Sequence, residues 1–144
     1  MYHQIEFYMQ QVAGNNLQTV KAFLKAVENR NGFEELPQFY HPDVIQTEYP
    51  NAITKNLANR TLKDLGNAAA KRKQVLQKEE YEIIHAYEIN DTVIIEAIWK
   101  CTLAISIGKL AAGDVMTAHF AQFFQFKDGK IFRQRNYDCF EPFY

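Results

Sequence analysis

Glu48 lies at the end of residues 43–49, a segment that the sequence predicts to be a strand, and the Pro50–Asn51 turn follows it. A carboxylate held against aromatic side chains has a raised pKa and can act as a general base near neutral pH. Glu48 is therefore the first candidate catalytic residue. Two structural roles stay open for it, namely an exposed glutamate at a strand end and an ion pair with Arg135. Asn51 either caps the turn or donates a hydrogen bond into a pocket.

Asp138 is the second candidate acid or base, and it lies in the last expected strand, residues 131–140. An ion pair with an arginine, satisfied within the sheet, would explain it equally well. Side chains alternate between the two faces of a strand. One face carries Gln134, Asn136 and Asp138, and the other carries Arg133, Arg135 and Tyr137. Only one of these sets can line a pocket unless a bulge intervenes, and the sequence leaves that choice open.

His119 is the third candidate catalytic residue and lies in the middle of an expected strand at residues 116–126. The ordinary pKa of histidine suits a base near neutral pH, although a histidine within a strand can also serve packing or an interface. Arg135 or Tyr137 would stabilise a developing oxyanion. The side chains expected to line a pocket or bind a ligand are Tyr49, Asn51, Trp99, Arg135 and Tyr137.

The sequence contains no spacing typical of a metal site. His3, His41 and His85 form no metal-ligand pattern with His119, and neither Cys-x-x-Cys nor His-Glu-x-x-His occurs. We therefore expect no metal and no cofactor. Both cysteines, Cys101 and Cys139, lie in apolar or aromatic stretches, and we expect two buried free thiols.

Length and composition limit the class of protein. A chain of 144 residues is typical of a single domain, and 47% hydrophobic residues suffice for one core. The 14% aromatic share indicates either a core of large rings or a cavity walled by them. A net charge of −1 without a basic stripe argues against nucleic acid as a partner. Neither a signal peptide nor an apolar run of membrane-spanning length appears, so we expect a cytoplasmic protein without membrane contact.

Apolar spacing predicts three helices in the first half of the chain. Leu17, Val20, Leu24 and Val27 define one buried face of a helix that begins at Asn15 or Asn16 and ends near residue 32. Residues 1–14 form either a terminal arm or an extra helix. A short second helix is expected over residues 33–40, interrupted by Pro37. The third begins at a capping box, and the basic run at residues 71–73 is expected to be its solvated end.

A two-residue period then predicts strands at residues 81–89, 92–107, 116–126 and 131–140. Helices followed by a run of strands indicate an α+β fold rather than a wound parallel sheet. In residues 92–107 every odd position is apolar, yet Ile94, Ile98 and Ala104 occupy even positions. Both faces of this strand therefore require at least partial cover.

Three segments resemble the nuclear transport factor 2-like superfamily, and within it the SnoaL-like proteins. They are FYHPDV at residues 39–44, EYPN at residues 48–51, and KDGKI at residues 127–131 with the stretch at residues 134–142. The resemblance implies a single domain over residues 1–144. It also implies a strongly curved antiparallel sheet forming a cone, a cystatin-like α+β barrel, with a pocket at its open end. A homodimer through the outer face of the sheet is implied too, which would cover the second apolar face.

Ketosteroid isomerases resemble the same layout and rely on a tyrosine and two aspartates. Local matching places Phe23, Tyr49 and Gln122 at those three positions, and Glu48 is one residue away from the base. The chemistry of that enzyme is therefore disfavoured here.

Two functions remain. The first is lyase, isomerase or cyclase activity by acid/base catalysis on a small apolar organic substrate. The alternative is a module without turnover that binds a small ligand or serves as a dimeric interaction module.

Overall fold

The computed structural model describes residues 2–29 and 35–144, with side chains described from Asn15 onward. The elements in chain order are α1 (Tyr2–Asn29), the 3-10 helix η1 (Leu36–Gln38), β1 (Tyr40–Glu48), β2 (Ala58–Arg60), α2 (Leu62–Val75), β3 (Leu76–Ile89), β4 (Thr92–Leu103), β5 (Val115–Lys127) and β6 (Lys130–Phe140). Among the described residues, no helix combines the length and the apolar character needed to cross a membrane.

The six strands form one open, mixed sheet in the order β2-β1-β6-β5-β4-β3. Neighbouring strands are antiparallel except β1 and β6, which are parallel. The expected antiparallel α+β barrel is therefore wrong, because the sheet is mixed and does not close, although the α+β class is confirmed. The parallel pair arises because β6 returns beside β1 only after α2 and three further strands, a connection long enough for parallel pairing.

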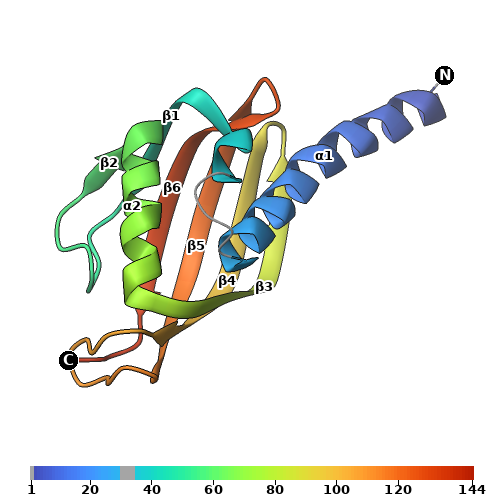
Figure 1. Cartoon of the computed structure of the whole chain (residues 1–144). Helices are drawn as coiled ribbons and strands as arrows, with labels where there is room; N and C mark the ends of the chain where they lie inside the picture. The colour runs from blue at the N-terminus through green and yellow to red at the C-terminus, as the bar shows by residue number, and fades with distance from the viewer. Residues whose placement is uncertain (1, 30–34) are drawn as a thin grey trace.

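Both α-helices cover the same face of the sheet (Figure 1). α1 packs on β3 and β4, whereas α2 lies against β1, β2 and β3. Two clusters of buried side chains fill the space between the helices and the sheet. One surrounds Phe23, whose ring meets Tyr40 at 5.4 Å and Phe124 at 5.9 Å between centroids. The other surrounds Trp99 and Phe120.

The expectation of three helices is wrong. α1 begins at Tyr2 and runs through Asn15 and Asn16, so neither asparagine starts it, and no proline interrupts this segment. Its expected end near residue 32 lies outside the described residues. The expected second helix is reduced to η1, because Pro37 lacks an N–H and the chain enters β1 at Tyr40.

The capping box of α2 is confirmed. Oγ1 of Thr61 accepts a hydrogen bond from the backbone N–H of Asp64, and Oδ2 of Asp64 accepts one from the backbone N–H of Thr61. The sequence analysis missed β2, whose three residues are too few to show a period. Of the two expected buried thiols, Cys101 is buried, whereas Cys139 is exposed on the outer face.

The strand expected to reach residue 107 ends at Leu103, and the following residues form a loop. Backbone hydrogen bonds fasten this loop, from Ala104 N–H to the Val75 carbonyl at 2.7 Å and from Lys109 N–H to the Phe143 carbonyl at 2.6 Å. Gly108 has φ +58°, and a Cβ there would lie 2.1 Å from the Phe143 carbonyl oxygen. The loop and the C-terminal segment are thus closely fitted to one another.

Candidate functional site

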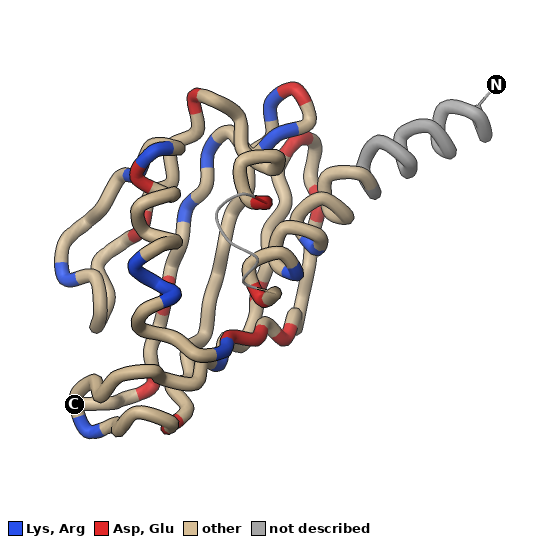
Figure 2. Tube along the Cα trace, viewed as in Figure 1, with Lys and Arg blue, Asp and Glu red and all other residues tan. Residues whose placement is uncertain are grey.

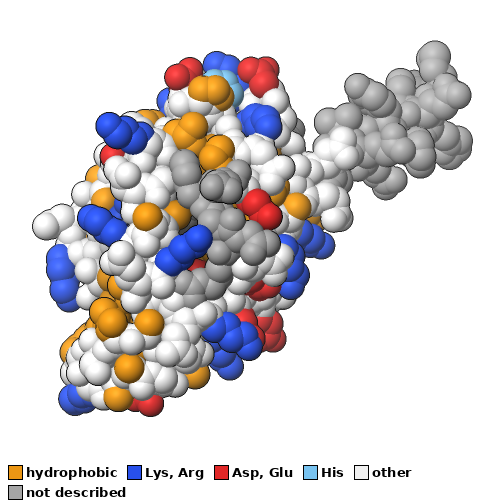
Figure 3. Space-filling model, in the orientation of Figure 1, with side chains coloured by type: hydrophobic (Ala, Val, Ile, Leu, Met, Phe, Trp, Pro, Cys, Tyr) orange, Lys and Arg blue, Asp and Glu red, His pale blue; other side chains and the backbone are white. Residues whose placement is uncertain are grey.

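A cavity of about 340 Å³ lies between the helices and the covered face of the sheet. Its wall is largely aromatic and aliphatic, and the rings of Trp99 and Phe120 stack at 5.3 Å with an interplanar angle of 20°. In Figure 3, hydrophobic side chains also gather over the loop that follows β4, and Ile107 of this loop lines the cavity. The main apolar lining residues are Phe23, Tyr40, Tyr81, Trp99, Phe120 and Phe140.

A polar strip crosses one side of this apolar wall. Strand register explains it, because Asn136 pairs with Glu48 on one neighbouring strand and with Gln122 on the other, and directly opposed residues share a face. Nε2 of Gln134 donates to Oδ1 of Asn136 at 2.9 Å. The members of the strip are Gln46, Glu48, Gln122, Gln134, Asn136 and Asp138. The choice of face in β6 is thereby decided in favour of the set that contains Asp138.

Glu48 lines the cavity, but its carboxylate is fully engaged. Its Oε1 accepts hydrogen bonds from Asn51 Nδ2 at 3.0 Å and Thr54 Oγ1 at 2.9 Å. Its Oε2 lies 2.6 Å from a terminal nitrogen of Arg60. Burial alone would raise the pKa of Glu48, but these hydrogen bonds and the charge of Arg60 outweigh it and hold the pKa below its ordinary value. Glu48 is thus a fixed anion, contrary to the expected base with a raised pKa.

Asp138 has the opposite electrostatic environment. Burial raises the pKa of its carboxyl to about 7, and the negative charge of Glu48 adds to the rise, while Arg72 and Arg60 oppose it. Oδ1 of Asp138 is buried and has no hydrogen-bond partner among the described residues. Of the two carboxylates, Asp138 can therefore exchange a proton near neutral pH while Glu48 remains ionised. Environments that separate the pKa values of two carboxyl groups in this way are typical of acid/base sites.

A second polar group lies at the helical side of the cavity. Nε of Arg72 lies 3.1 and 2.9 Å from the two carboxylate oxygens of Glu79, and one terminal nitrogen lies 2.7 Å from Oε1. Nε1 of Trp99 donates to the same Oε1 at 3.1 Å. Figure 2 shows basic positions in the second half of α2 and acidic positions at the start of β3, the two segments that this ion pair joins. The basic run at residues 71–73 is therefore not simply a solvated helix end.

Four of the expected site residues lie on the opposite face of the sheet. His119 is exposed and lies 3.3 Å from Glu141, and the rings of Tyr49 and Tyr137 stack at 4.5 Å. Arg135 lies over the ring of Phe123 at 5.1 Å. A bulge near Asp138 could have turned these side chains inward, but the register shift between β5 and β6 falls at Gln125/Phe126 instead.

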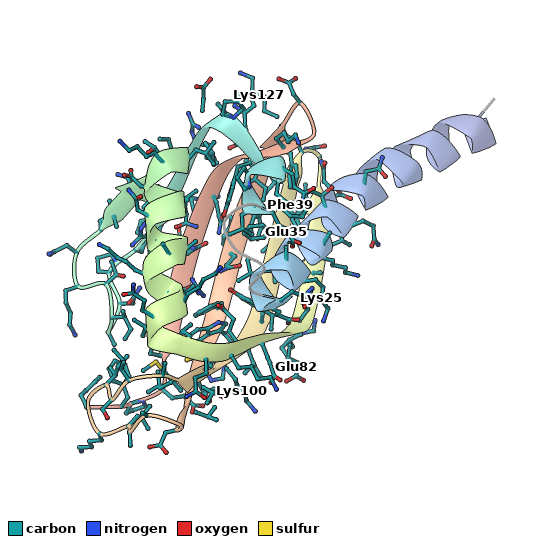
Figure 4. All side chains as sticks on the ribbon, in the orientation of Figure 1. Lys25, Glu35, Phe39, Glu82, Lys100 and Lys127 are labelled. Carbon is teal, nitrogen blue, oxygen red and sulfur yellow. The ribbon has the colours of Figure 1, made fainter. Side chains whose placement is uncertain are left out.

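The cavity thus brings together Glu48, Trp99 and Asp138 of the predicted residues, with Asn51 held on Glu48. His119, Tyr49, Arg135 and Tyr137 do not join them. Figure 4 shows Lys127 at the β5–β6 turn and Lys100 and Glu82 toward the opposite end of the sheet. All three side chains are exposed, and none of them lines the cavity.

Sequence reasoning missed Arg60, Thr54, Arg72 and Glu79. No local signal marks the first two, because their role depends on β2 and its turn meeting β1. The sequence does contain a signal for Glu79. It lies two residues before Tyr81, so both side chains point to the same face of the strand, the face that lines the cavity. A buried glutamate requires a cation, and Arg72 is the nearby arginine that supplies it.

In the part of the chain that the structure describes, no group of three or more histidine, cysteine, aspartate or glutamate side chains could hold a metal ion.

Comparison with known proteins gives a consistent family and fold. The family model of the SnoaL-like domain matches residues 20–134. No curated protein matches the chain. Similar solved structures include AclR from Streptomyces galilaeus, named as a hydroxylase. Its sequence is 12% identical, the TM-score is 0.74, and the match covers 90% of this chain and 82% of that chain.

Two further structures are similar. IdmH from Streptomyces antibioticus, named as a polyketide cyclase, has 13% identity and a TM-score of 0.72, with 85% of this chain and 91% of that chain covered. An LEH-like epoxide hydrolase from M. tuberculosis has 19% identity and a TM-score of 0.65, with 90% of this chain and 84% of that chain covered. At these identities the likeness establishes the fold alone.

Proposed function

Because the chain belongs to the SnoaL-like family, we propose that it is an acid/base catalyst acting on a small, largely apolar organic molecule, with Asp138 as the proton-carrying group. The observation that carries this proposal is the unpaired Oδ1 of Asp138, which is buried beside the cavity on a carboxyl with a pKa of about 7. A pKa near the working pH gives a general base or acid its best efficiency. Many lyase, isomerase and cyclase reactions begin with such a transfer.

In this proposal the Asp138 carboxylate removes a proton from the bound substrate and returns it at another atom. Glu48 stays ionised because Asn51, Thr54 and Arg60 hold it. Burial, with the charge of Glu48 added, raises the pKa of Asp138 and keeps it from being a permanent carboxylate. A substrate packed against the aromatic wall displaces water and strengthens these interactions. The amides of Gln122 and Asn136 are available to orient polar groups of the substrate.

The structural relatives support conversion of small molecules without specifying a reaction. Their names include a polyketide cyclase, a hydroxylase and an epoxide hydrolase, so one fold carries several chemistries. The alternative function, a module that binds a small ligand without turnover, is favoured by the mostly apolar wall and by the engagement of Glu48. Both functions use the same cavity, and they differ in whether Asp138 exchanges protons with the ligand.

Deuterium incorporation tests the proposal even while the substrate is unidentified. A small-molecule extract of the source organism is incubated in D₂O with the wild-type protein, and mass spectrometry identifies compounds that gain deuterium or change in mass. We expect Asp138→Asn to lower this conversion at least about 100-fold, the typical contribution of a general base. His119→Gln is the matched control on the outer face and should retain wild-type conversion.

The conversion rate should rise with pH through about 7, as Asp138 loses its proton. If wild type converts no compound, the enzyme proposal fails and the binding module gains. Equal conversion by wild type and Asp138→Asn would assign the proton transfer to another group.

A further inference from the structure

We infer that the occupant of this cavity is an organic anion, an apolar body carrying a carboxylate or enolate oxygen, and that Arg72 binds this oxygen. The inference deepens the proposed function, because it takes from that proposal a small organic molecule in the cavity. It adds the chemical class of the molecule and a residue that recognises it.

The first observation is the fixed orientation of the Arg72 guanidinium. Glu79 accepts hydrogen bonds from Nε and from one terminal nitrogen, with distances of 2.7 to 3.1 Å. The Glu79 side chain is only 2% exposed, whereas that of Arg72 is 42% exposed and lines the cavity. Glu79 thus anchors one edge of the guanidinium. The other terminal nitrogen has no hydrogen bond to a described residue, so its N–H groups remain for a ligand. Guanidinium groups bind carboxylates and similar oxyanions through such paired N–H groups.

The second observation is the balance of charge around the cavity. Arg60, Lys71 and Arg72 contribute three cations, while Glu48 and Glu79 neutralise two of them. The third cation, Lys71, is exposed, so with Asp138 protonated the lining carries one net positive charge. This charge favours a bound organic anion over a neutral ligand of the same shape.

The third observation is a pair of acceptors at the opposite, strand side of the cavity. Oε1 of Gln134 and Oδ1 of Asp138 are buried and have no hydrogen-bond partner within residues 15–29 and 35–144. They suit a hydroxyl or another proton donor of the ligand. An oxyanion at Arg72 and a donor at Asp138 would fix the long axis of the ligand across the cavity.

A purely structural role of Arg72 as the counter-ion of Glu79 makes a different prediction. It would give the cavity no preference for charged over neutral ligands. Truncation of Arg72 alone cannot separate the two roles, because it leaves a buried, uncompensated carboxylate that can unfold the protein.

The test therefore compares Glu79→Gln with the double variant Arg72→Met/Glu79→Gln. Neither contains the Glu79 charge, and they differ only at Arg72. The probes are phenylbutyrate and its neutral isostere phenylbutyramide, titrated at low salt. Trp99 is the single tryptophan of the chain and lines the cavity, so its fluorescence reports binding. Calorimetry supplies an independent dissociation constant, and circular dichroism checks that both variants are folded.

We expect phenylbutyrate to bind Glu79→Gln at least about tenfold more tightly than it binds the double variant, as one charge-assisted hydrogen bond would require. Phenylbutyramide should bind both variants equally. Equal binding of phenylbutyrate to both variants would overturn the inference, as would the absence of phenylbutyrate binding to wild type and to Glu79→Gln.

The Asp138→Asn variant separates this inference from the proposed function. It should retain the preference for phenylbutyrate, because Arg72 is intact. If the preference is present while Asp138→Asn still converts substrate normally, the acid/base proposal fails and the anion site stands. If conversion depends on Asp138 but the preference is absent, the anion site fails and the acid/base proposal stands.

Discussion

Asp138 and Glu48 line one cavity, and their pKa values move in opposite directions. Burial raises that of Asp138 to about 7, whereas hydrogen bonds from Asn51, Arg60 and Thr54 offset the burial of Glu48 and lower its pKa. The difference arises from the number of donors that reach each carboxyl group. One carboxyl group is thereby suited to exchange a proton, and the other to remain a fixed charge.

The raised pKa of Asp138 predicts a dependence of stability on pH. The unfolded carboxyl ionises near pH 4, whereas the folded one keeps its proton up to about pH 7. Between these values the folded state binds more protons, so the free energy of unfolding falls as the pH rises from about 4 to about 7. Asp138→Asn has no carboxyl group at this position, so its free energy of unfolding does not fall for this reason. We expect it to exceed wild type by on the order of 2–4 kcal/mol at about pH 8, with the advantage gone at about pH 4.

Urea denaturation at the two pH values measures this difference. Glu96→Gln, an exposed substitution on the outer face of β4, serves as the control and should show no comparable change. A constant difference between Asp138→Asn and wild type at both pH values would mean that Asp138 is already ionised in the folded state.

At the scale of elements, the loop after β4 closes one end of the cavity through Ile107 and is fastened to the C-terminal segment. The fastening depends on Gly108, because its positive φ and its proximity to the Phe143 carbonyl oxygen leave no room for a side chain. Phe143 in turn packs into the cluster around Trp99. The shape of this end of the cavity thus depends on a backbone contact.

Gly108→Ala is expected to destabilise the protein by about 3 kcal/mol or more, since it adds a clash with backbone to the cost of a positive φ. Gly129→Ala is the matched control. Gly129 also has a positive φ, of +72°, but nothing lies within 4 Å of a Cβ there, so we expect a loss of only about 1 kcal/mol. Thermal unfolding followed by circular dichroism compares the two. Equal losses would show that the loop yields easily at Gly108.

The β4 strand shows how far periodicity predicts an element. Its odd positions are buried from Val93 to Leu103, as the sequence analysis predicts. Its end was predicted four residues too late, because Ile105 and Ile107 continue the apolar pattern inside the loop. Nothing in this pattern marks the turn, which involves contacts with distant segments, such as the hydrogen bond from Ala104 N–H to the Val75 carbonyl and the contact of Gly108 with Phe143.

For the whole molecule, the outer face of the sheet bears large apolar side chains that no described element covers. Tyr87 and Ile89 are 53% and 59% exposed, and Ile94, Ile98 and Phe123 are only partly buried. Surface apolar groups that form a continuous patch are typical of an interaction site. The homodimer expected through this face remains a prediction.

Phe123→Lys should convert the predicted dimer to a monomer, because a cation at the centre of the outer face would lose its hydration on association. Size-exclusion chromatography with light scattering measures the mass. Asn67→Lys, an exposed change on α2 at the other side of the sheet, should leave the dimer intact. A wild-type protein that is monomeric at high concentration would contradict the prediction.

The amino-acid sequence by itself determined the α+β class, the SnoaL-like family, the capping box of α2 and the alternation of β4 and β5. These features depend on local periodicity and on short motifs. It also identified Glu48 and Asp138 as the carboxyl groups of interest, Glu48 from its place at a strand end before the Pro50–Asn51 turn and Asp138 from its place late in the sheet of a SnoaL-like fold.

The tertiary structure alone decided which face of β6 lines the cavity, and with it which carboxyl group can exchange a proton. Side-chain alternation separates two faces without saying which of them the helices cover. The pKa of Glu48 depends on Arg60 and Thr54, which only the fold brings to it. The same holds for Arg72, which pairs with Glu79 and lies over the ring of Trp99, residues of two neighbouring strands. Pairing between distant segments, rather than any local pattern, brings these side chains to one cavity.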